Sequence, residues 1–224
     1  MQVGIVTGLQ AEADAFCAGA GETVHDLPFP VRLLGRSGHR IAVASAGIGK
    51  VNAATAATAL VLNHQAQLLL VIGTAGKLSA LAGDCFWLAE ALQHDYGAAR
   101  PGSFAHFSAG EWPIGEARIA AFAAMADPGT ALPHARIATG DAFVECPDHS
   151  RRLTSHLAAD LVDMETAAVA QVAARFGLTW AAIKATTDEA NGDSAGDFQA
   201  NLAAAAARSA AAADRLVGML VNGL

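Results

Sequence analysis

Acidic side chains stand at the ends of three apolar runs in this sequence. Glu12 follows the apolar run at the N-terminus. Glu165 stands two residues after the run 161–163, and Asp188 ends the run that begins at Trp180. Ligands of open α/β sheets bind at the carboxyl ends of strands, so we expect the three carboxylates to converge on one site. Carboxylates beside small-residue loops suit a polar, uncharged ligand such as a sugar.

Each acid also has an ordinary structural interpretation. Glu12, in the first turn of an expected helix, could complement the helix dipole. Asp188 could be a turn or N-cap residue, and Glu165 a solvated helix carboxylate. Isolated histidines such as His94 are typical of surface or capped core positions rather than of ligands. The coincidence of three acids at strand ends favours a shared site.

Glycine-rich segments follow three of the expected strands. The segment 46–50, Ala-Gly-Ile-Gly-Lys, is not a phosphate loop, because Ala44 and Val51 stand where that motif needs Gly and Ser or Thr. A dinucleotide fingerprint fails at Asn52. We interpret these glycines, together with those at 73–76, as places where the backbone approaches a ligand or a neighbouring helix.

The elements that must position these residues alternate between strands and helices, which predicts an α/β fold: a three-layer α/β/α domain with a mixed central sheet. Expected strands are 3–6, 31–34, 40–45, 68–72, 85–89, 136–139, 161–163 and 180–188; expected helices include 50–62, 149–156 and 198–221. The hairpin near residue 36 makes the sheet mixed. The pattern weakens between 83 and 133, and the aromatic-rich stretch 93–113 is expected to be a long excursion that needs a partner surface.

Composition limits the classes of protein that the chain can represent. With 224 residues, 53% of them hydrophobic and 16% charged, we expect residues 1–224 to form a single domain. A net charge of −7 without a basic run argues against nucleic-acid and anionic-membrane partners. Three widely spaced cysteines fit neither a disulfide framework nor a zinc site. The N-terminus is typical of a strand rather than a signal peptide, and no apolar run reaches the roughly 20 residues that span a bilayer, so a cytoplasmic location is expected.

Six short motifs together resemble the nucleoside phosphorylase/nucleosidase superfamily. They lie at 4–12, 45–53, 73–76, 139–143, 162–165 and 187–188, and the resemblance covers about residues 3 to 215, with a poor match over 93–133. It implies a nucleoside phosphorylase-like fold. It also implies hydrolysis of the N-glycosidic bond of a 5′-substituted purine nucleoside, of the 5′-methylthioadenosine/S-adenosylhomocysteine type, without a metal or cofactor.

The resemblance also assigns catalytic roles by position. Asp188 matches the general acid that protonates the departing base at N7, and Glu12 matches the acid that orients the attacking water. Glu165 matches the carboxylate that binds the ribose 2′- and 3′-hydroxyls, with Met164 packed under the sugar.

Further positions match binding residues of the superfamily. Phe143 matches the aromatic residue that stacks on the purine, the Val144 backbone reads the base edge, and Phe198 lines the pocket of the 5′ substituent. Thr74 and Thr187 replace serines. Three other replacements are Lys184 for an arginine, Asp163 for a glutamate and Leu9 for a methionine.

Partners and alternatives follow from the same resemblance. It implies a small-molecule nucleoside substrate. The apolar surface of the aromatic stretch predicts a homodimer, and in the nucleosidases that the chain resembles a neighbouring subunit also completes the 5′ pocket. A phosphorolytic enzyme would need a cationic phosphate pocket, but Val71 and Ile72 stand where the phosphorylases carry an arginine; a partner subunit could supply Arg32, Arg36 or Arg40. A futalosine-type hydrolase would differ in the base pocket. A non-catalytic nucleoside-binding protein would lack Glu12 or Asp188.

Overall fold

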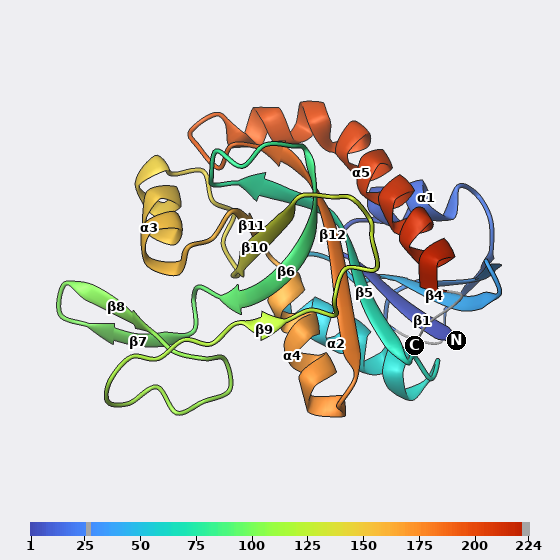
Figure 1. Cartoon of the computed structure of the whole chain (residues 1–224), viewed down its shortest axis with the longest axis horizontal. Helices are drawn as coiled ribbons and strands as arrows, with labels where there is room; N and C mark the ends of the chain where they lie inside the picture. Colours follow the sequence, from blue (N-terminus) through green and yellow to red (C-terminus); the bar gives the residue numbers. More distant parts are fainter. Residues whose placement is uncertain (26–27, 221–224) are drawn as a thin grey trace.

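The computed structural model describes residues 1–25 and 28–220, which form three layers (Figure 1). Helices α2 (Lys50–Leu62) and α4 (Thr166–Phe176) cover one face of a ten-stranded sheet. Helices α1 (Gln10–Cys17) and α5 (Ser194–Met219) cover the other face. Helix α3 (Pro147–Leu157) lies at one end. The predicted α/β/α architecture is confirmed.

The sheet is mixed, as the sequence predicts. In spatial order its strands are β11 (Leu161–Asp163), β10 (His134–Thr139), β6 (Cys85–Gln93), β12 (Thr179–Asp188), β5 (Leu68–Lys77), β1 (Gln2–Thr7), β4 (His39–Ser45), β3 (Val31–Arg36) and β2 (Glu22–Val24), while β9 (Phe122–Ala123) pairs with β6. Strands β12, β5, β1 and β4 run parallel, and the β3–β4 hairpin is antiparallel. Strand β11 also pairs with β5, so one side of the sheet curls back on itself.

The central strand β5 is longer than the sequence indicates. Residues 68–72 are buried on both faces, as predicted for a parallel strand between two helix layers. Residues 73–76 were expected to form a loop, but they continue the strand and pair with β12 and β11. The prediction was wrong because the neighbouring strands satisfy the backbone of these glycines, which local composition does not reveal.

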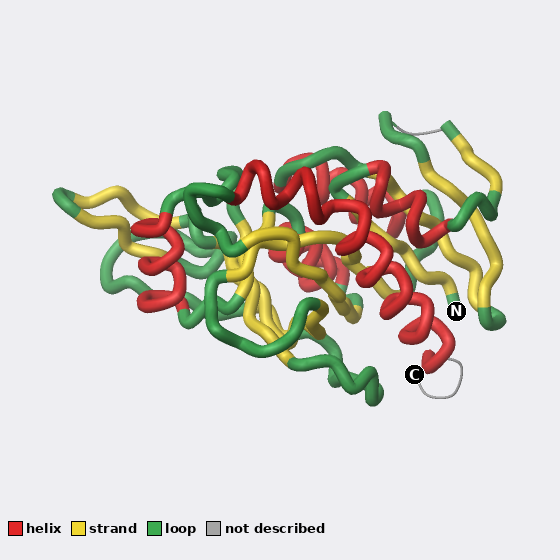
Figure 2. The backbone as a smooth tube through the Cα atoms, turned by 90° about the horizontal axis from the view of Figure 1, so that it is seen from above, coloured by secondary structure: helices red, strands yellow, loops and turns green. Residues whose placement is uncertain are grey.

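The aromatic-rich excursion contains a small sheet of its own. Strands β7 (Gly97–Arg100) and β8 (Ser103–His106) form a hairpin that projects from the body of the molecule (Figure 2). We call residues 97–121 the arm. At the other end of the chain, α5 begins at Ser194, four residues before the expected Phe198, and Val221 lies outside the described residues. No helix in the described part of the chain has the length and apolarity to cross a membrane.

His94 lies directly after β6 and supports the 139–143 loop. Its side chain is buried, and a Cβ built on Gly140 would lie 2.3 Å from its Nε2, so only glycine fits there. The ring of His149 meets it edge-on, with the ring centroids 5.5 Å apart. Burial lowers the pKa of His94 to about 4, and the neighbouring His149, Lys50 and His106 add to this effect while Asp95 opposes it.

We therefore predict that His94 makes the fold acid-sensitive. Between pH 6.5 and about 4, the unfolded chain binds a proton that folded His94 does not, so stability falls as the pH falls. The full difference is at most about 3 kcal/mol. Urea unfolding should show that His94→Gln flattens the loss of stability between pH 7 and 5, whereas the same change at exposed His25 does not. Parallel pH profiles for His94→Gln and the parent would contradict this.

Candidate active site

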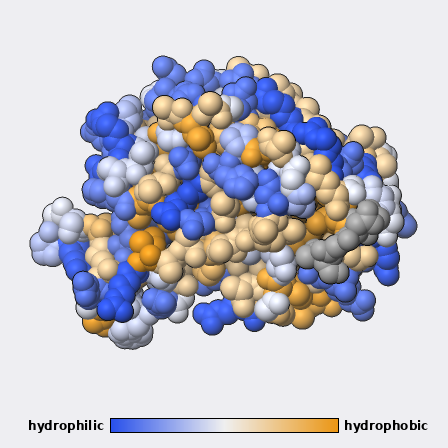
Figure 3. All heavy atoms as spheres, in the orientation of Figure 1, coloured by the Kyte–Doolittle hydropathy of each residue, from blue (hydrophilic) through white to orange (hydrophobic). Residues whose placement is uncertain are grey.

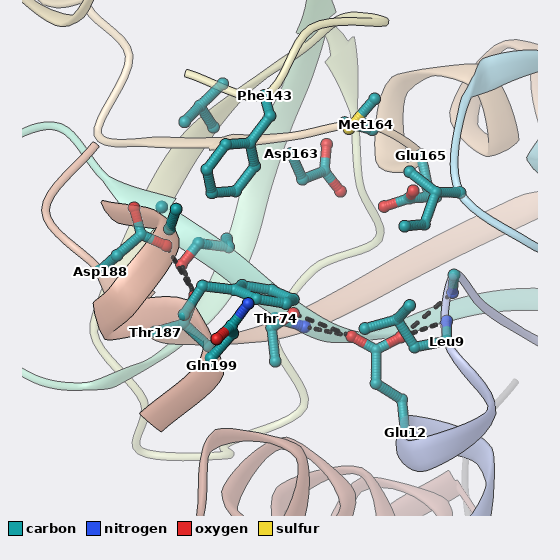
Figure 4. Close-up of a pocket in the computed structure, with 17 residues that line it drawn as sticks. Leu9, Glu12, Thr74, Phe143, Asp163, Met164, Glu165, Thr187, Asp188 and Gln199 are labelled. Atoms are coloured by element: carbon teal, nitrogen blue, oxygen red, sulfur yellow. Dashed lines mark hydrogen bonds between the residues drawn. The ribbon is translucent and has the colours of Figure 1, made fainter. Parts of the chain in front are cut away.

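A cavity of about 490 Å³ opens at the carboxyl ends of β1, β5, β11 and β12 (Figure 4). Of the predicted site residues, it brings together Asp188, Glu12, Glu165, Met164, Phe143, Thr74, Thr187 and Phe198. The three acids come from different elements and are 3 to 6% exposed. The expected convergence of the carboxylates is therefore present in the structure.

Glu12 lies in the first turn of α1, and its carboxylate accepts four hydrogen bonds. The Gly8 and Leu9 N–H groups donate to Oε2 at 3.1 and 3.0 Å. The Thr74 N–H and hydroxyl donate to Oε1 at 2.8 and 3.0 Å. Four donors match an ionised carboxylate, which is an acceptor only. Glu12 thus joins the end of β1 to β5 as well as capping its own helix.

Asp188 ends β12 at an irregularity of the sheet. The register shifts between Thr186 and Asp188, which leaves Thr187 as an extra residue opposite β5. Consecutive residues of a regular strand point to opposite faces, but a bulge re-aims them. Both Thr187 and Asp188 consequently line the cavity. The Asp188 carboxylate accepts the Thr187 hydroxyl at 2.8 Å and the Ala190 N–H at 2.9 Å.

Glu165 is the N-cap residue of α4 and accepts the Gly49 N–H at 3.1 Å. Burial raises its pKa to about 7, and the nearby Asp163 and Glu12 act in the same direction. Lys184 opposes that rise only in part, because its Nζ lies 3.6 Å from Glu165 but 3.0 Å from Asp163. Near neutral pH both the protonated and the ionised form of the Glu165 carboxyl are therefore populated. Ligand hydroxyls that donate hydrogen bonds to it would favour the ionised form.

Asp163 also lines the cavity, and its hydrogen bonds hold the elements around Glu165 together. Besides Lys184, its carboxylate accepts the Thr139 hydroxyl at 2.6 Å and both the N–H and the hydroxyl of Thr166. These contacts join β10, β11, β12 and the start of α4. Asp163 thus holds the helix that presents Glu165.

Each of the three acids packs against a glycine. A Cβ on Gly8 would lie 3.0 Å from Glu165 Oε1, and one on Gly76 would lie 3.1 Å from Asp188 Oδ1. At Gly73, whose φ is +139°, a Cβ would lie 2.4 Å from Glu12 Oε1. Of the glycines that the sequence analysis interprets as places of close backbone approach, Gly73 and Gly76 approach the site's own carboxylates.

Aromatic side chains form the opposite wall. The rings of Phe143, from the 139–143 loop, and Phe198, from α5, meet edge-on with their centroids 5.9 Å apart. In Figure 4 the Phe143 ring points toward the space between Asp188 and Glu165. Val144 does not line the main cavity; it borders a smaller one of about 30 Å³ beside Phe143 and Asp188.

Nine further lining residues were not among the predicted site residues: Gly8, Leu9, Ile48, Ala75, Gly76, Val162, Asp163, Ala195 and Gln199. Gln199 follows Phe198 in the early turns of α5, and a helix that presents one residue to a cavity can present its neighbour too. The spacing from Phe198 was the available signal. In the described residues, no group of His, Cys, Asp or Glu side chains is placed to hold a metal ion.

Comparison with known proteins shows which family the chain belongs to. A model of the phosphorylase superfamily matches residues 2–218. The 5′-methylthioadenosine/S-adenosylhomocysteine nucleosidase of Mycobacterium bovis is 30% identical over 210 residues, which cover 81% of this chain and 82% of the relative.

Two solved structures share the fold. The nucleosidase of that name from S. pneumoniae, solved with a transition-state inhibitor, has a TM-score of 0.86 at 24% identity and covers 98% of this chain and 100% of its own. The futalosine hydrolase of Helicobacter pylori has a TM-score of 0.83 at 24% identity and covers 98% of each chain. The chain thus belongs to the phosphorylase superfamily, with 5′-methylthioadenosine/S-adenosylhomocysteine nucleosidases among its relatives.

Proposed function

We propose that the protein hydrolyses the N-glycosidic bond of a 5′-substituted adenosine, of the 5′-methylthioadenosine/S-adenosylhomocysteine type, and releases adenine. The relatives of the chain identify it as an N-ribosyl purine nucleosidase. The substrate and the role of each residue are the parts that we propose. The observation that carries the proposal is the single cavity in which Glu12, Glu165 and Asp188 meet the Phe143 and Phe198 rings.

The reaction needs a leaving base that departs neutral and a sugar that tolerates positive charge. In our proposal, the bond between C1′ and N9 breaks, its electron pair goes to the purine, and Asp188 gives a proton to N7. The oxygen of a water molecule bonds to C1′, and Glu12, assisted by Thr74, orients that water and takes its proton. The products are adenine and the 5-substituted ribose.

Binding is divided between the two walls of the cavity. Glu165 accepts hydrogen bonds from the 2′- and 3′-hydroxyls, and Met164 packs under the sugar. A carboxylate that receives two hydroxyls holds them more strongly than a neutral group would. Phe143 stacks on the purine, the Val144 backbone reads its edge, and Thr187 orients Asp188 through its hydroxyl. The 5′ substituent then lies against Phe198.

We also propose that the chain, as one domain, works as a homodimer. Phe104, Trp112 and Ile114 of the arm are exposed, and Figure 3 shows apolar atoms on the arm at the left of the view. Ile48 and Val51, where α2 begins beside the cavity, are exposed as well. Apolar patches of this kind mark protein interfaces. A second copy that covers them would close the open side of the 5′ pocket.

The first prediction concerns the proton donor. Asp188→Asn keeps the volume of the side chain but removes the proton, so turnover of 5′-methylthioadenosine should fall by about 100-fold or more. Adenine release measured by chromatography tests this, with Asp193→Asn as the control because Asp193 is exposed and lies outside the cavity. Turnover of Asp188→Asn within a few-fold of the parent would rule out its role.

The second prediction is that the nucleophile is water. A phosphate dianion needs cationic partners in a buried site, and the described residues that line the cavity include no Lys, Arg or His. Of the candidate arginines, Arg32 pairs with Asp14 and Arg36 with Asp214. Free 5-methylthioribose should form at equal rates with and without phosphate. A rate that depends on phosphate, with a ribose 1-phosphate as the sugar product, would overturn the hydrolase proposal. Assaying a futalosine-type substrate in the same way tests which base and which 5′ group the enzyme accepts.

The third prediction concerns the dimer. Light scattering at micromolar concentration should give twice the mass of the chain. Val51→Asp places a charge on the exposed face of α2 and should yield monomers with a raised KM, whereas Met219→Asp, on the opposite layer of the molecule, should remain dimeric. A fully active monomeric parent would contradict the proposal.

A further inference from the structure

The 139–143 loop, which carries Phe143, is held by few contacts. It leaves β10 at Thr139 and reaches α3 at Pro147. The Gly140 N–H donates to the Asp163 carbonyl at 3.0 Å, and Gly140 rests on the buried ring of His94. The next residue, Asp141, makes its contacts outside the cavity.

Three charged residues tie this loop to the start of α2. Lys50 Nζ lies 2.6 Å from Asp95 Oδ1 and 4.0 Å from Asp141 Oδ2. The Asp141 N–H donates to Asp95 Oδ2 at 2.9 Å, and Asp141 Oδ1 accepts the Lys50 backbone N–H at 2.8 Å. We call Lys50, Asp95 and Asp141 the clasp. Every pair within it is joined, so none of the three can move alone.

The charges of the clasp depend on Lys50. Burial works against the ionised form of Asp95, but hydrogen bonds from Lys50 and from the Asp141 N–H outweigh it and hold the pKa of Asp95 below its ordinary value. The N-terminus of α2 adds its own partial positive charge beside Asp141. Without the ammonium group, two carboxylates would remain close together and repel each other.

The same helix N-terminus touches the opposite wall of the cavity. Gly49, the N-cap residue of α2, donates its N–H to Glu165, while the first residue of the helix, Lys50, donates to Asp141. One helix end therefore fixes the carboxylate on one wall and the loop of Phe143 on the other. None of the clasp residues lines the cavity itself.

We propose that Lys50, Asp95 and Asp141 are positioning residues of the nucleosidase, which set the distance between the aromatic wall and the Glu165 wall by clasping the 139–143 loop to α2. What the two walls bind rests on the proposed function. The placement of the loop by the clasp does not.

The consequence for catalysis is a separation of binding from chemistry. The clasp acts on Phe143, which meets the base, but not on Asp188 or Glu12, which are fixed by β12, α1 and β5. Loosening it should weaken substrate binding and leave the proton transfers intact. Substitutions in networks of this kind change binding by roughly twofold to thirtyfold.

The test compares Lys50→Met and Asp95→Asn with the parent. KM for 5′-methylthioadenosine should rise by about tenfold while kcat changes less than about threefold, and Lys50→Arg should restore most of the loss. Added salt should raise the KM of the parent toward that of Lys50→Met and affect the variant less. Arg32→Met is the control, because it also removes a cation from an ion pair, the 3.1 Å contact with exposed Asp14, but this pair lies away from the loop.

Hydrogen exchange of residues 139–145 gives a second measurement that needs no turnover. Exchange in this segment should be faster in Lys50→Met and Asp95→Asn than in Arg32→Met. The proposed role of the clasp would be overturned if Lys50→Met and Asp95→Asn left both the exchange rates and KM unchanged, or changed them only as much as Arg32→Met does. A parent that fails to cleave the nucleoside would instead count against the proposed function, and the exchange rates would still decide the role of the clasp.

Discussion

The ammonium group of Lys184 is 1% exposed, and the acidic site depends on it. Glu12, Asp163 and Glu165 are buried at adjoining strand ends, where like charges out of water are costly. Burial alone would lower the pKa of Lys184, but Asp163, Glu165 and Glu12 outweigh burial and raise it, so the side chain stays charged. Because Lys184 pairs more closely with Asp163 than with Glu165, it compensates mainly the charge of Asp163, and the pKa of Glu165 stays near neutrality.

Space for these carboxylates comes from the backbone. Gly8, Gly73 and Gly76 leave room where any other side chain would push an acid aside. The strand bulge before Asp188 works in the same sense, since it turns two consecutive side chains toward one cavity. Main-chain geometry therefore sets the separation of the acids more firmly than side-chain packing, which fits a reaction that needs fixed proton positions.

Sequence patterns predicted the parts of the fold that depend on local periodicity. The bounds of α2 and the buried run at the start of β5 agree with the structure, and the strands of the β3–β4 hairpin agree within two residues, because apolar spacing and turn residues determine them. The continuation of β5 through Gly76 was missed, since it depends on pairing with strands distant in sequence. The contact of Asp95 with Asp141 could not be predicted for the same reason, because no local pattern encodes it.

The two walls of the cavity differ in how they are held, and this difference bears on specificity. Acids on the strand side are fixed by sheet register and by buried hydrogen bonds, as at Glu12. The other wall consists of a loop and the first turns of α5, where Phe143 and Phe198 rest on each other and Gln199 is exposed. In the mechanism that we propose, bond cleavage requires the first wall to keep its position, whereas the choice of base and 5′ substituent requires only that the second wall fit the ligand. Under the proposed function, substitutions in the second wall would therefore change the nucleoside that is accepted without moving the acids to which we assign the proton transfers.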